Sequence, residues 1–245
     1  MSRPVNRIQA TAVDGWWRRL GIGLCPPRCL ACREPAPAGA DLCQACQAEL
    51  PWNRNACPRC AVPLPEAGMA DTPCGACQRR PSPLQQAHAA FVYGAPLDRL
   101  LPRFKFHRDL AAGRLLADAM ATCFATLPRP GALLPVPLHA GRLRRRGYDQ
   151  ALELARPLAR TLRLPLLDGA LVRTRATAPQ SELDAASRRR NLRGAFAVRG
   201  GARLPAHVAL VDDVMTTGAT LHAAAFALRR AGVARVDAWV CARVP

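Results

Sequence analysis

A stretch of thirteen residues, 208–220, constrains the fold of this chain most strongly; it reads Val-Ala-Leu-Val-Asp-Asp-Val-Met-Thr-Thr-Gly-Ala-Thr. Its first four residues form a continuous apolar run, which is typical of a strand buried on both faces of a parallel sheet. Asp212 and Asp213 follow this run, and apolar residues at helical spacing begin at Leu221. The stretch therefore predicts a strand, a loop and a helix in an α/β fold.

The loop of this unit predicts a site for ribose 5-phosphate. Open α/β sheets bind ligands at the carboxyl ends of their strands, where the amides of a helix N-terminus favour a phosphate. A glycine allows close approach of the backbone, threonine hydroxyls add donors, and the two carboxylates can accept hydrogen bonds from ribose hydroxyls. The residues expected to form the site are Asp212, Asp213, Thr216, Thr217, Gly218, Ala219 and Thr220.

This pattern of an apolar strand, Asp-Asp and a Thr-Thr-Gly loop resembles the binding motif for phosphoribosyl pyrophosphate (PRPP) of type I phosphoribosyltransferases. The resemblance implies their fold, a parallel sheet flanked by helices. Two other interpretations stay open: a polar turn without a ligand, and the magnesium-aspartate site of another α/β family. The first leaves two carboxylates at a buried strand end without partners, and the second does not require the threonine-glycine loop.

Eight cysteines in four CxxC pairs predict two structural zinc sites. Two pairs supply the four thiolates of one tetrahedral ion and leave no position open to water. The pairs can combine in three ways, and pairing consecutive ones closes the shorter loops. An iron–sulfur cluster or a redox CxxC motif is the alternative. The expected ligands are Cys29, Cys32, Cys43, Cys46, Cys57, Cys60, Cys74 and Cys77.

The order of these features predicts three parts: a lead-in helix over 1–24, a double zinc ribbon over 25–80 and a phosphoribosyltransferase-like domain over 88–245. The linker 78–87 is rich in proline and polar residues. Within the last domain we expect strands at 88–93, 133–137, 164–172, 208–211 and 235–243. Expected helices span 97–107 (broken near Pro102), 110–127, 151–162 (bent at Pro157) and the region from 221 onward.

A second ligand loop is predicted after the strand at 133–137. Its arginines can bind pyrophosphate oxygens in pairs through their guanidinium groups, and a lysine between two phenylalanines can join them. These residues are Lys105, Arg142, Arg144, Arg145 and Arg146. The alternatives are a solvated basic face and a lysine lying along the surface. The basic segment 173–193 suits either a mobile cover over the site or an exposed helix.

Composition limits the partners and the compartment. The formal net charge is +18, and Lys105 is the only lysine in the chain, so nearly all of the basic charge is arginine. A polyanion is a plausible partner, although arginine richness can also reflect genome composition. No run of 18 apolar residues occurs, and the first residues lack the apolar core of a signal peptide. We therefore expect a cytoplasmic protein without a membrane span.

Taken together, these motifs resemble the ComF family (ComFC-like) of bacterial competence and DNA-utilisation proteins. The features that carry the resemblance are the four CxxC pairs, Phe-Lys-Phe at 104–106, Pro-Val-Pro-Leu-His at 135–139, the arginine-rich run to Gln150, Gln180 with Leu183, Arg190-Asn191, Gly-Ala-Phe at 194–196, and the Asp-Asp loop. Asp149 replaces the usual asparagine and adds a negative charge near the expected pyrophosphate loop. The resemblance implies a role in natural transformation or the use of external DNA.

Two functions from different classes follow. In the first, the chain binds PRPP or a nucleotide while its basic surface and zinc ribbons engage single-stranded DNA and a DNA-uptake helicase or recombination protein. In the second, it is an enzyme that transfers ribose 5-phosphate from Mg²⁺-bound PRPP to a nitrogen acceptor. No residues in the sequence identify the acceptor. A redox function of the cysteines is a third alternative, which requires a protein without zinc.

Overall fold

The computed structural model describes residues 27–65, 72–175 and 194–245, and the chain forms two compact units, Met1–Glu49 and Leu50–Pro245. The second unit contains the sheet together with the cysteines from Cys57 to Cys77. Among the described residues, no helix is long and apolar enough to cross a membrane. The lead-in helix at 1–24 and the greater part of the expected cover, residues 176–193, lie outside the described residues.

The second unit is built on a parallel sheet, as expected for the α/β class. Its strands are β1 (Ala87–Val92), β2 (Ala132–Pro135), β5 (His207–Met215) and β6 (Arg235–Arg243), arranged in the order β1-β6-β5-β2. All three pairings are parallel. The central strands are apolar on both faces, and Val208 to Val211 and Val240 to Ala242 are fully buried. Such continuous burial requires helices on both sides.

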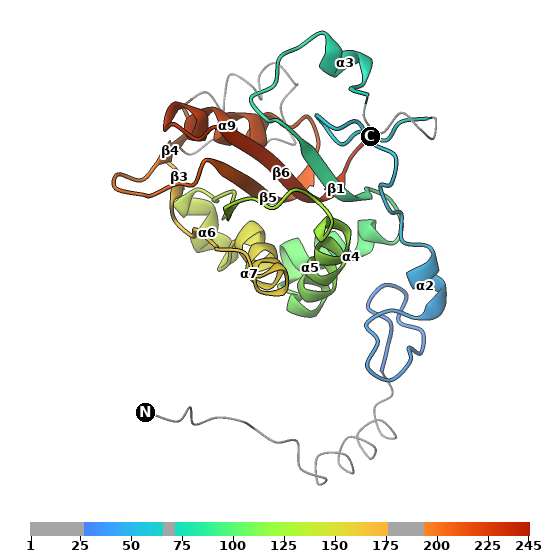
Figure 1. Ribbon diagram of the computed structural model, residues 1–245. Helices are drawn as coiled ribbons and strands as arrows, with labels where there is room; N and C mark the ends of the chain where they lie inside the picture. The colour runs from blue at the N-terminus through green and yellow to red at the C-terminus, as the bar shows by residue number, and fades with distance from the viewer. Residues whose placement is uncertain (1–26, 66–71, 176–193) are drawn as a thin grey trace, which may run out of the picture. The chain divides into compact units, whose positions relative to one another are not determined.

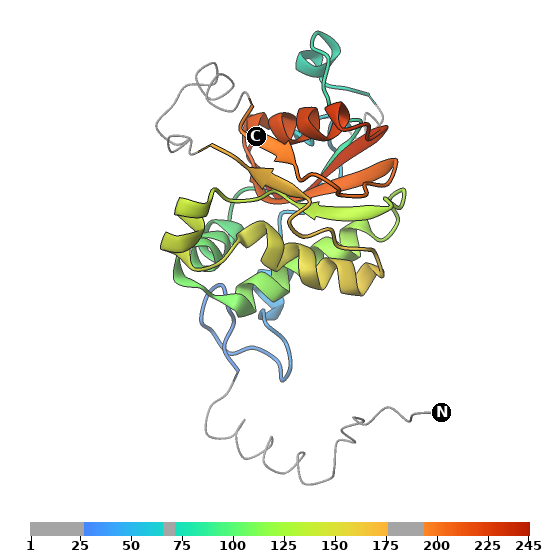
Figure 2. The same cartoon turned by 90° about the vertical axis from the view of Figure 1, so that its left-hand side faces the viewer.

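Helices cover both faces of this sheet (Figures 1 and 2). On one face lies α9 (Ala219–Arg230). On the other lie α4 (Leu97–His107), α5 (Leu110–Phe124), α6 (Ala140–Arg146) and α7 (Gln150–Leu162). Helix α4 is continuous, with Pro102 inside it, so the expected break is absent. The helix expected over 151–162 is present as α7 and includes Pro157.

The strand expected over 164–172 is wrong, because the chain turns within it. Only Leu166 bridges β2, at Leu133. Gly169 then adopts a φ of +74° and redirects the chain into β3 (Leu171–Arg173). Strand β3 pairs antiparallel with β4 (Phe196–Val198) in a separate two-stranded sheet. The dipeptide Asp168-Gly169 is a turn signal inside this apolar run, and the assignment from periodicity overlooked it.

Short segments of the second unit cover both edges of the parallel sheet. Beside β1, Trp52 bridges Phe91, Asn53 N donates to Ala90 O at 3.0 Å, and Ala87 N donates to Pro58 O at 2.8 Å. Beside β2, Leu167 N donates to Leu133 O at 2.9 Å. Their backbone groups are thus protected from pairing with another chain.

A charged cluster closes the amino end of the sheet. Asp237 is only 2% exposed, and its carboxylate lies 2.8 Å from His207 Nε2 and 2.9 Å from the Arg235 guanidinium. Gln86 N donates to the same carboxylate at 3.2 Å. This cluster joins β1, β5 and β6 at their starts, at the opposite end from Asp212 and Asp213.

We predict that Asp237→Asn destabilises the sheet unit by about 2–4 kcal/mol, because it leaves a partly buried arginine without its counter-charge. Thermal melting of the zinc-loaded protein measures the loss. The control is Asp118→Asn, since Asp118 is exposed on α5. Equal melting temperatures of the two variants would show that the cluster adds nothing to stability.

Candidate functional site

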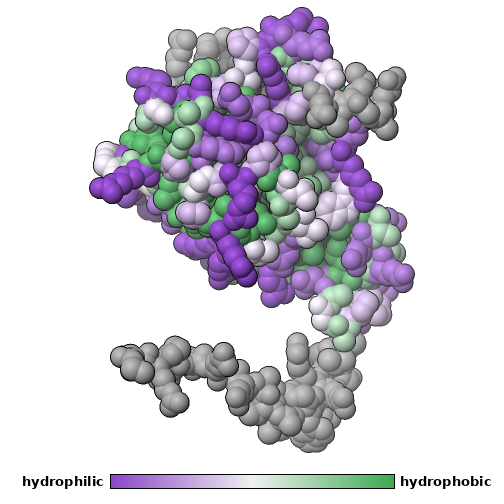
Figure 3. Space-filling view, viewed as in Figure 1, coloured by the Kyte–Doolittle hydropathy of each residue, from purple (hydrophilic) through white to green (hydrophobic). Residues whose placement is uncertain are grey.

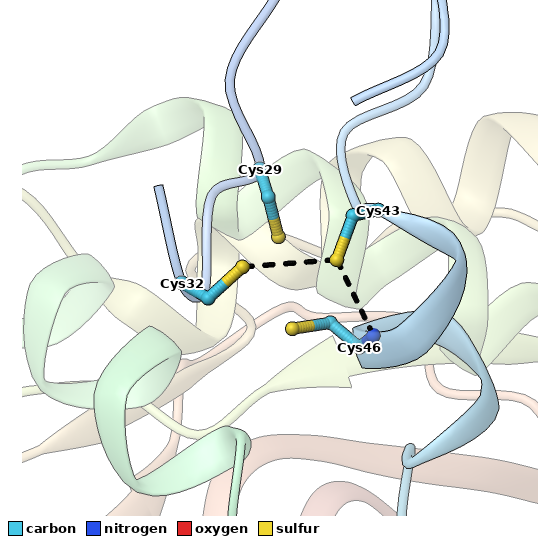
Figure 4. A group of neighbouring side chains, drawn as sticks. All are labelled: Cys29, Cys32, Cys43 and Cys46. Atoms are coloured by element: carbon cyan, nitrogen blue, oxygen red, sulfur yellow. Dashed lines mark hydrogen bonds between the residues drawn. The ribbon is translucent and has the colours of Figure 1, made fainter. Parts of the chain in front are cut away.

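The first cysteine cluster lies in the first unit (Figure 4). Cys29 and Cys32 come from a hairpin turn, in which Cys29 N donates to Glu34 O and Arg33 N donates to Cys29 O. Cys43 caps the short helix α2 (Gln44–Ala48), and its Sγ accepts from Cys46 N at 3.5 Å. The figure shows the four sulfur atoms pointing toward one another.

The second cluster, in the second unit, repeats this design. Cys57 N donates to Val62 O and Ala61 N donates to Cys57 O, which is the same pair of bonds as at Cys29. The residue after each first CxxC pair, Arg33 or Ala61, has a positive φ. Cys74 precedes the short helix α3 (Gly75–Gln78), as Cys43 precedes α2, but its sulfur atom accepts no capping hydrogen bond; its backbone N donates to Cys57 Sγ at 3.2 Å. The chain thus contains the same ribbon twice.

Both clusters fit a zinc ion. The four Sγ atoms of each lie within 4.8 Å of one another. A tetrahedral ion with Zn–S bonds of about 2.3 Å requires sulfur atoms about 3.8 Å apart. The Cys32–Cys43 and Cys60–Cys74 Sγ pairs are each 3.7 Å apart. The consecutive pairing expected from loop length is therefore confirmed: 29/32 with 43/46, and 57/60 with 74/77.

A cavity of about 640 Å³ opens at the carboxyl end of β5. Acidic and basic side chains from four stretches that are distant in sequence face into it. Its polar and charged lining residues are Lys105, Arg142, Arg145, Arg146, Asp149, Gln150, Arg173, Asp212, Asp213 and Thr220. This mixture of three carboxylates and five cations suits a ligand that carries both hydroxyl groups and phosphates.

The two carboxylates lie within strand β5 and not after it, which corrects the expected strand end at Val211. The strand continues because Asp212 still pairs with Val240, and Met215 with Arg243, on β6. Asp213 is only 7% exposed. Burial of the carboxyl and the neighbouring charge of Asp213 together raise the pKa of Asp212 well above its usual range. A ligand that donates hydrogen bonds to these oxygens would relieve that repulsion.

Lys105 pairs with a carboxylate of this site and does not lie along the surface. Its Nζ is 2.8 Å from Asp213 Oδ2, and its side chain is 30% exposed. It reaches the cavity from α4, more than a hundred residues earlier in the sequence. The sequence showed that Lys105 is suited to a phosphate, but it gave no signal for a carboxylate partner.

The arginines around the carboxylates come mainly from a helix, where a loop was expected. Residues 140–146 form α6, which His139 caps by accepting from Gly141 N and Gly147 ends with a φ of +82°. The helical repeat directs Arg142, Arg145 and Arg146 into the cavity, whereas Arg144 is not among its lining residues. Burial, then Arg146 and Arg145, lower the pKa of Arg142. Such crowded positive charge favours an anion.

Sequence reasoning placed Arg173 only in the basic segment 173–193, not among the ligand-binding residues, and assigned Asp149 a different effect. Arg173 lies on β3 and lines the cavity, and burial and the charge of Arg142 lower its pKa. Asp149 caps α7: it accepts from Leu152 N at 3.2 Å and from Leu138 N at 2.9 Å. Burial raises the pKa of Asp149, while these amides act in the opposite direction. Its carboxylate therefore holds α7 and the β2–α6 connection together, in addition to facing the cavity.

The threonine-glycine loop follows β5 and leads into α9. Gly218 has a φ of +74°, and Thr217 Oγ1 accepts from Ala219 N at 3.4 Å. Thr220, in the first turn of α9, lines the cavity together with the carboxylates. Thr216, Thr217, Gly218 and Ala219 lie in the adjoining turn and are not among the lining residues. The positive φ favours glycine at this position; a Cβ there would also lie 2.6 Å from Met215 Cε, the end of a flexible side chain that can move.

We predict that Gly218→Ala costs about 1–2 kcal/mol of stability, from left-handed backbone strain, because the flexible end of Met215 can move away from the new Cβ. Gly232→Ala is the matched control, because Gly232 also has a positive φ but its Cβ would meet nothing within 4 Å. We expect the control to lose the same amount, about 1–2 kcal/mol. Melting curves of both variants test this; a clearly larger loss for Gly218→Ala would show that Met215 cannot move.

Fold and site thus define a class of protein: a double zinc ribbon joined to an α/β unit with a charged cavity at the carboxyl end of its sheet. In agreement, residues 23–87 match the family model of the double zinc ribbon domain. The chain is 39% identical over 186 residues to the DNA utilization protein YhgH of Salmonella typhi. This match covers 72% of this chain and 80% of that protein.

Two competence proteins are also similar. Competence protein F of Haemophilus influenzae is 39% identical over 178 residues, covering 69% of this chain and 78% of that protein. Competence protein ComFC of Bacillus subtilis is 28% identical over 153 residues, and the match covers 62% of this chain and 61% of that protein. The chain belongs to the ComF family, as the sequence motifs indicated.

Proposed function

We propose that this chain is a DNA-utilisation protein of the ComF type whose cavity binds PRPP with its Mg²⁺. The observation that carries the proposal is the meeting of Asp212 and Asp213 with five cationic side chains in one cavity. The carboxylates would accept hydrogen bonds from the ribose hydroxyls. Thr220 and the adjoining turn would hold the 5-phosphate, and Lys105 with the arginines of α6 would hold the pyrophosphate.

Mg²⁺ fits this donor set, because carboxylates and phosphate oxygens are the ligands it prefers. When bound with PRPP, it would neutralise charge on the pyrophosphate. The side chains named above would position the ribose, its 5-phosphate and the pyrophosphate.

Calorimetry of the zinc-loaded protein tests this proposal. PRPP with Mg²⁺ is expected to bind more tightly than ribose 5-phosphate, because only PRPP reaches both the carboxylates and the arginines. Arg145→Ala is expected to lower the affinity for PRPP by about tenfold, because one charge-assisted contact is lost. The control is Arg230→Ala, because Arg230 is exposed at the far end of α9. A protein that binds neither PRPP nor any nucleotide would refute the proposal.

A second part of the proposal is contact with single-stranded DNA beside the cavity. Phe106 is 64% exposed, and the Arg146 guanidinium lies 5.2 Å from the centre of its ring. Leu143, 40% exposed, and the remaining arginines of α6 are nearby in sequence. An exposed aromatic ring among arginines is the combination that single-strand binding uses. On the face visible in Figure 3, hydrophilic and hydrophobic side chains are interspersed.

The relatives' names support a DNA role, since they are called DNA utilization and competence proteins. Binding of a short oligonucleotide at several salt concentrations tests it. The affinity of the wild-type protein is expected to fall steeply with salt, and Phe106→Ala is expected to lose about 1–3 kcal/mol of binding free energy. Phe226→Ala is the matched control, because Phe226 is 58% exposed on α9. Equal effects of the two substitutions would contradict this surface, and salt-independent binding would contradict the DNA role.

The alternative is an active phosphoribosyltransferase. The same cavity would hold PRPP while a nitrogen nucleophile displaces pyrophosphate from C1 of the ribose. Incubation of the protein with PRPP, Mg²⁺ and a panel of nucleobases separates the two functions. Release of pyrophosphate with one base would favour the enzyme over a binding protein alone.

A further inference from the structure

Lys105 is an unusual choice of side chain at its position. Of the 35 basic residues of the chain it is the only lysine, so every other cationic position is an arginine. Its charged group contacts a carboxylate inside the cavity, at 2.8 Å from Asp213 Oδ2. Lysine differs from arginine in carrying a compact charge on a flexible stem with three donors, so its ammonium group can exchange between partners.

Lys105 is therefore a competitor for any ligand group that is to bond Asp213. Asp213 is 7% exposed, and its Oδ2 is engaged by the Lys105 ammonium. A ribose hydroxyl that is to bond this oxygen must displace or share the lysine. Displacing it without a substitute leaves a cation with reduced access to water, which is costly. A ligand that brings an anion close to Asp213 removes that cost, because the ammonium can move from the carboxylate to the anion.

We propose that Lys105 is an exchangeable counter-ion that makes this site select sugar phosphates carrying a pyrophosphate group on C1. In the unliganded protein it neutralises Asp213. When PRPP binds, it transfers its hydrogen bonds to the pyrophosphate and frees Asp213 for the ribose. Ribose 5-phosphate brings no such anion and has to compete with the lysine. This inference rests on the proposed PRPP site and adds a residue that determines its specificity.

The ion pair itself can be tested without any ligand. Because Lys105 is the only lysine, an amine-reactive acylating reagent can modify a single side chain besides the N-terminal amine, and peptide mapping separates the two. In the wild-type protein the ammonium group is engaged by Asp213 Oδ2 at 2.8 Å, which limits its encounter with the reagent. Asp212→Asn/Asp213→Asn removes this contact and is expected to accelerate the modification by about tenfold. The control, Asp98→Asn in the first turn of the same helix, is expected to react at the wild-type rate. Unchanged reactivity in the double variant would refute the ion pair.

The exchange is tested by the affinities of two ligands for Lys105→Met. Loss of the lysine is expected to lower the affinity for PRPP by about tenfold, because a charge-assisted contact is lost. The same substitution is expected to leave the affinity for ribose 5-phosphate unchanged or to raise it, because the lysine no longer competes for Asp213. If Lys105 had a merely structural role, the affinities for both ligands would fall by the same factor, and that result would overturn the proposal.

Lys105→Arg keeps the positive charge and serves as the second variant. It is expected to retain a smaller preference for PRPP than the wild-type protein, because the charge is kept but the compact, flexible ammonium group is lost. A complete loss of the preference would contradict an exchange of charge. If the wild-type protein binds neither ligand, the proposed function fails and the exchange fails with it. The rate of lysine modification decides the ion pair in either case, so the two failures are distinguishable.

Discussion

Replacing both Asp212 and Asp213 by asparagine is expected to abolish PRPP binding and to leave the zinc content unchanged. Each carboxylate is expected to accept a charge-assisted hydrogen bond worth about 1.5–3 kcal/mol, so losing both weakens binding by about 100-fold or more. The cysteine clusters do not include either aspartate. Calorimetry with PRPP and Mg²⁺, together with the ratio of zinc to protein, measures both parts. PRPP binding at wild-type affinity would show that the ligand does not use these carboxylates.

The single variant Asp212→Asn separates binding from stability. The pKa of Asp212 is raised in the folded chain, first by burial and then by Asp213. The folded state therefore binds the proton more strongly than the unfolded state, and the ionised carboxylate lowers stability at neutral pH. Asparagine keeps the oxygen that accepts from Asp213 N, at 2.8 Å, and removes the charge. We expect the variant to be more stable by about 0.5–2 kcal/mol at neutral pH while it binds PRPP less well.

The sign of this effect can be checked with pH. As the pH falls below the raised pKa, Asp212 takes up a proton in the folded wild-type protein and its destabilising charge disappears. The difference in melting temperature between the two proteins is therefore expected to shrink as the pH is lowered from neutral toward the usual carboxyl range. A difference that stays constant over this interval would exclude the Asp212 charge as its cause.

The second large effect is expected from Cys57→Ser. Cys57 is completely buried, and its ribbon is bonded to the sheet: Arg243 Nε on β6 donates to Cys60 O at 2.8 Å. Loss of the second zinc ion therefore removes both the ribbon and the support of β1 and β6. Binding of a structural zinc supplies about 10 kcal/mol or more of folding free energy in small zinc domains. We expect the sheet unit to melt at least 10 °C lower, or to fail to fold.

Cys29→Ser is the matched variant. It removes a ligand of the first zinc ion, which belongs to the other compact unit. We expect it to release one zinc ion and to leave the melting of the sheet unit and the binding of PRPP almost unchanged. Cys123→Ser controls for cysteine substitution in general, because Cys123 lies in α5, outside both clusters. If Cys29→Ser and Cys57→Ser lowered the melting temperature of the sheet equally, the second ribbon would have no special role.

Features set by local chemistry could be predicted from the sequence. The CxxC pairs were assigned to two sites with the correct partners, because loop length and four-coordination leave few choices. The α/β class followed from apolar strands with carboxylates at one end. The end of β5 was not predicted correctly. The strand pairs with β6 as far as Met215, whereas the apolar run in the sequence ends at Val211.

Features that depend on distant parts of the chain could not be predicted. The ion pair between Lys105 and Asp213 joins α4 to β5, and Arg173 enters the cavity from a strand that exists only because Gly169 turns the chain. The arginines at 142–146 were assigned to a loop, because a helix of seven residues with four arginines shows no apolar repeat. Its helical form decides which of them face the cavity.

The cover over the open edge of β1 has a consequence for the metal-free chain. The edge is protected by Trp52, Asn53 and Pro58, which belong to the segment leading into and through the second ribbon. Strand β1, Ala-His-Ala-Ala-Phe-Val, is short of charge and buried along most of its length. Once zinc is removed, this strand can pair with the same strand of another molecule. Chains made under zinc starvation should therefore accumulate as insoluble aggregates, and adding the metal before they associate should rescue them.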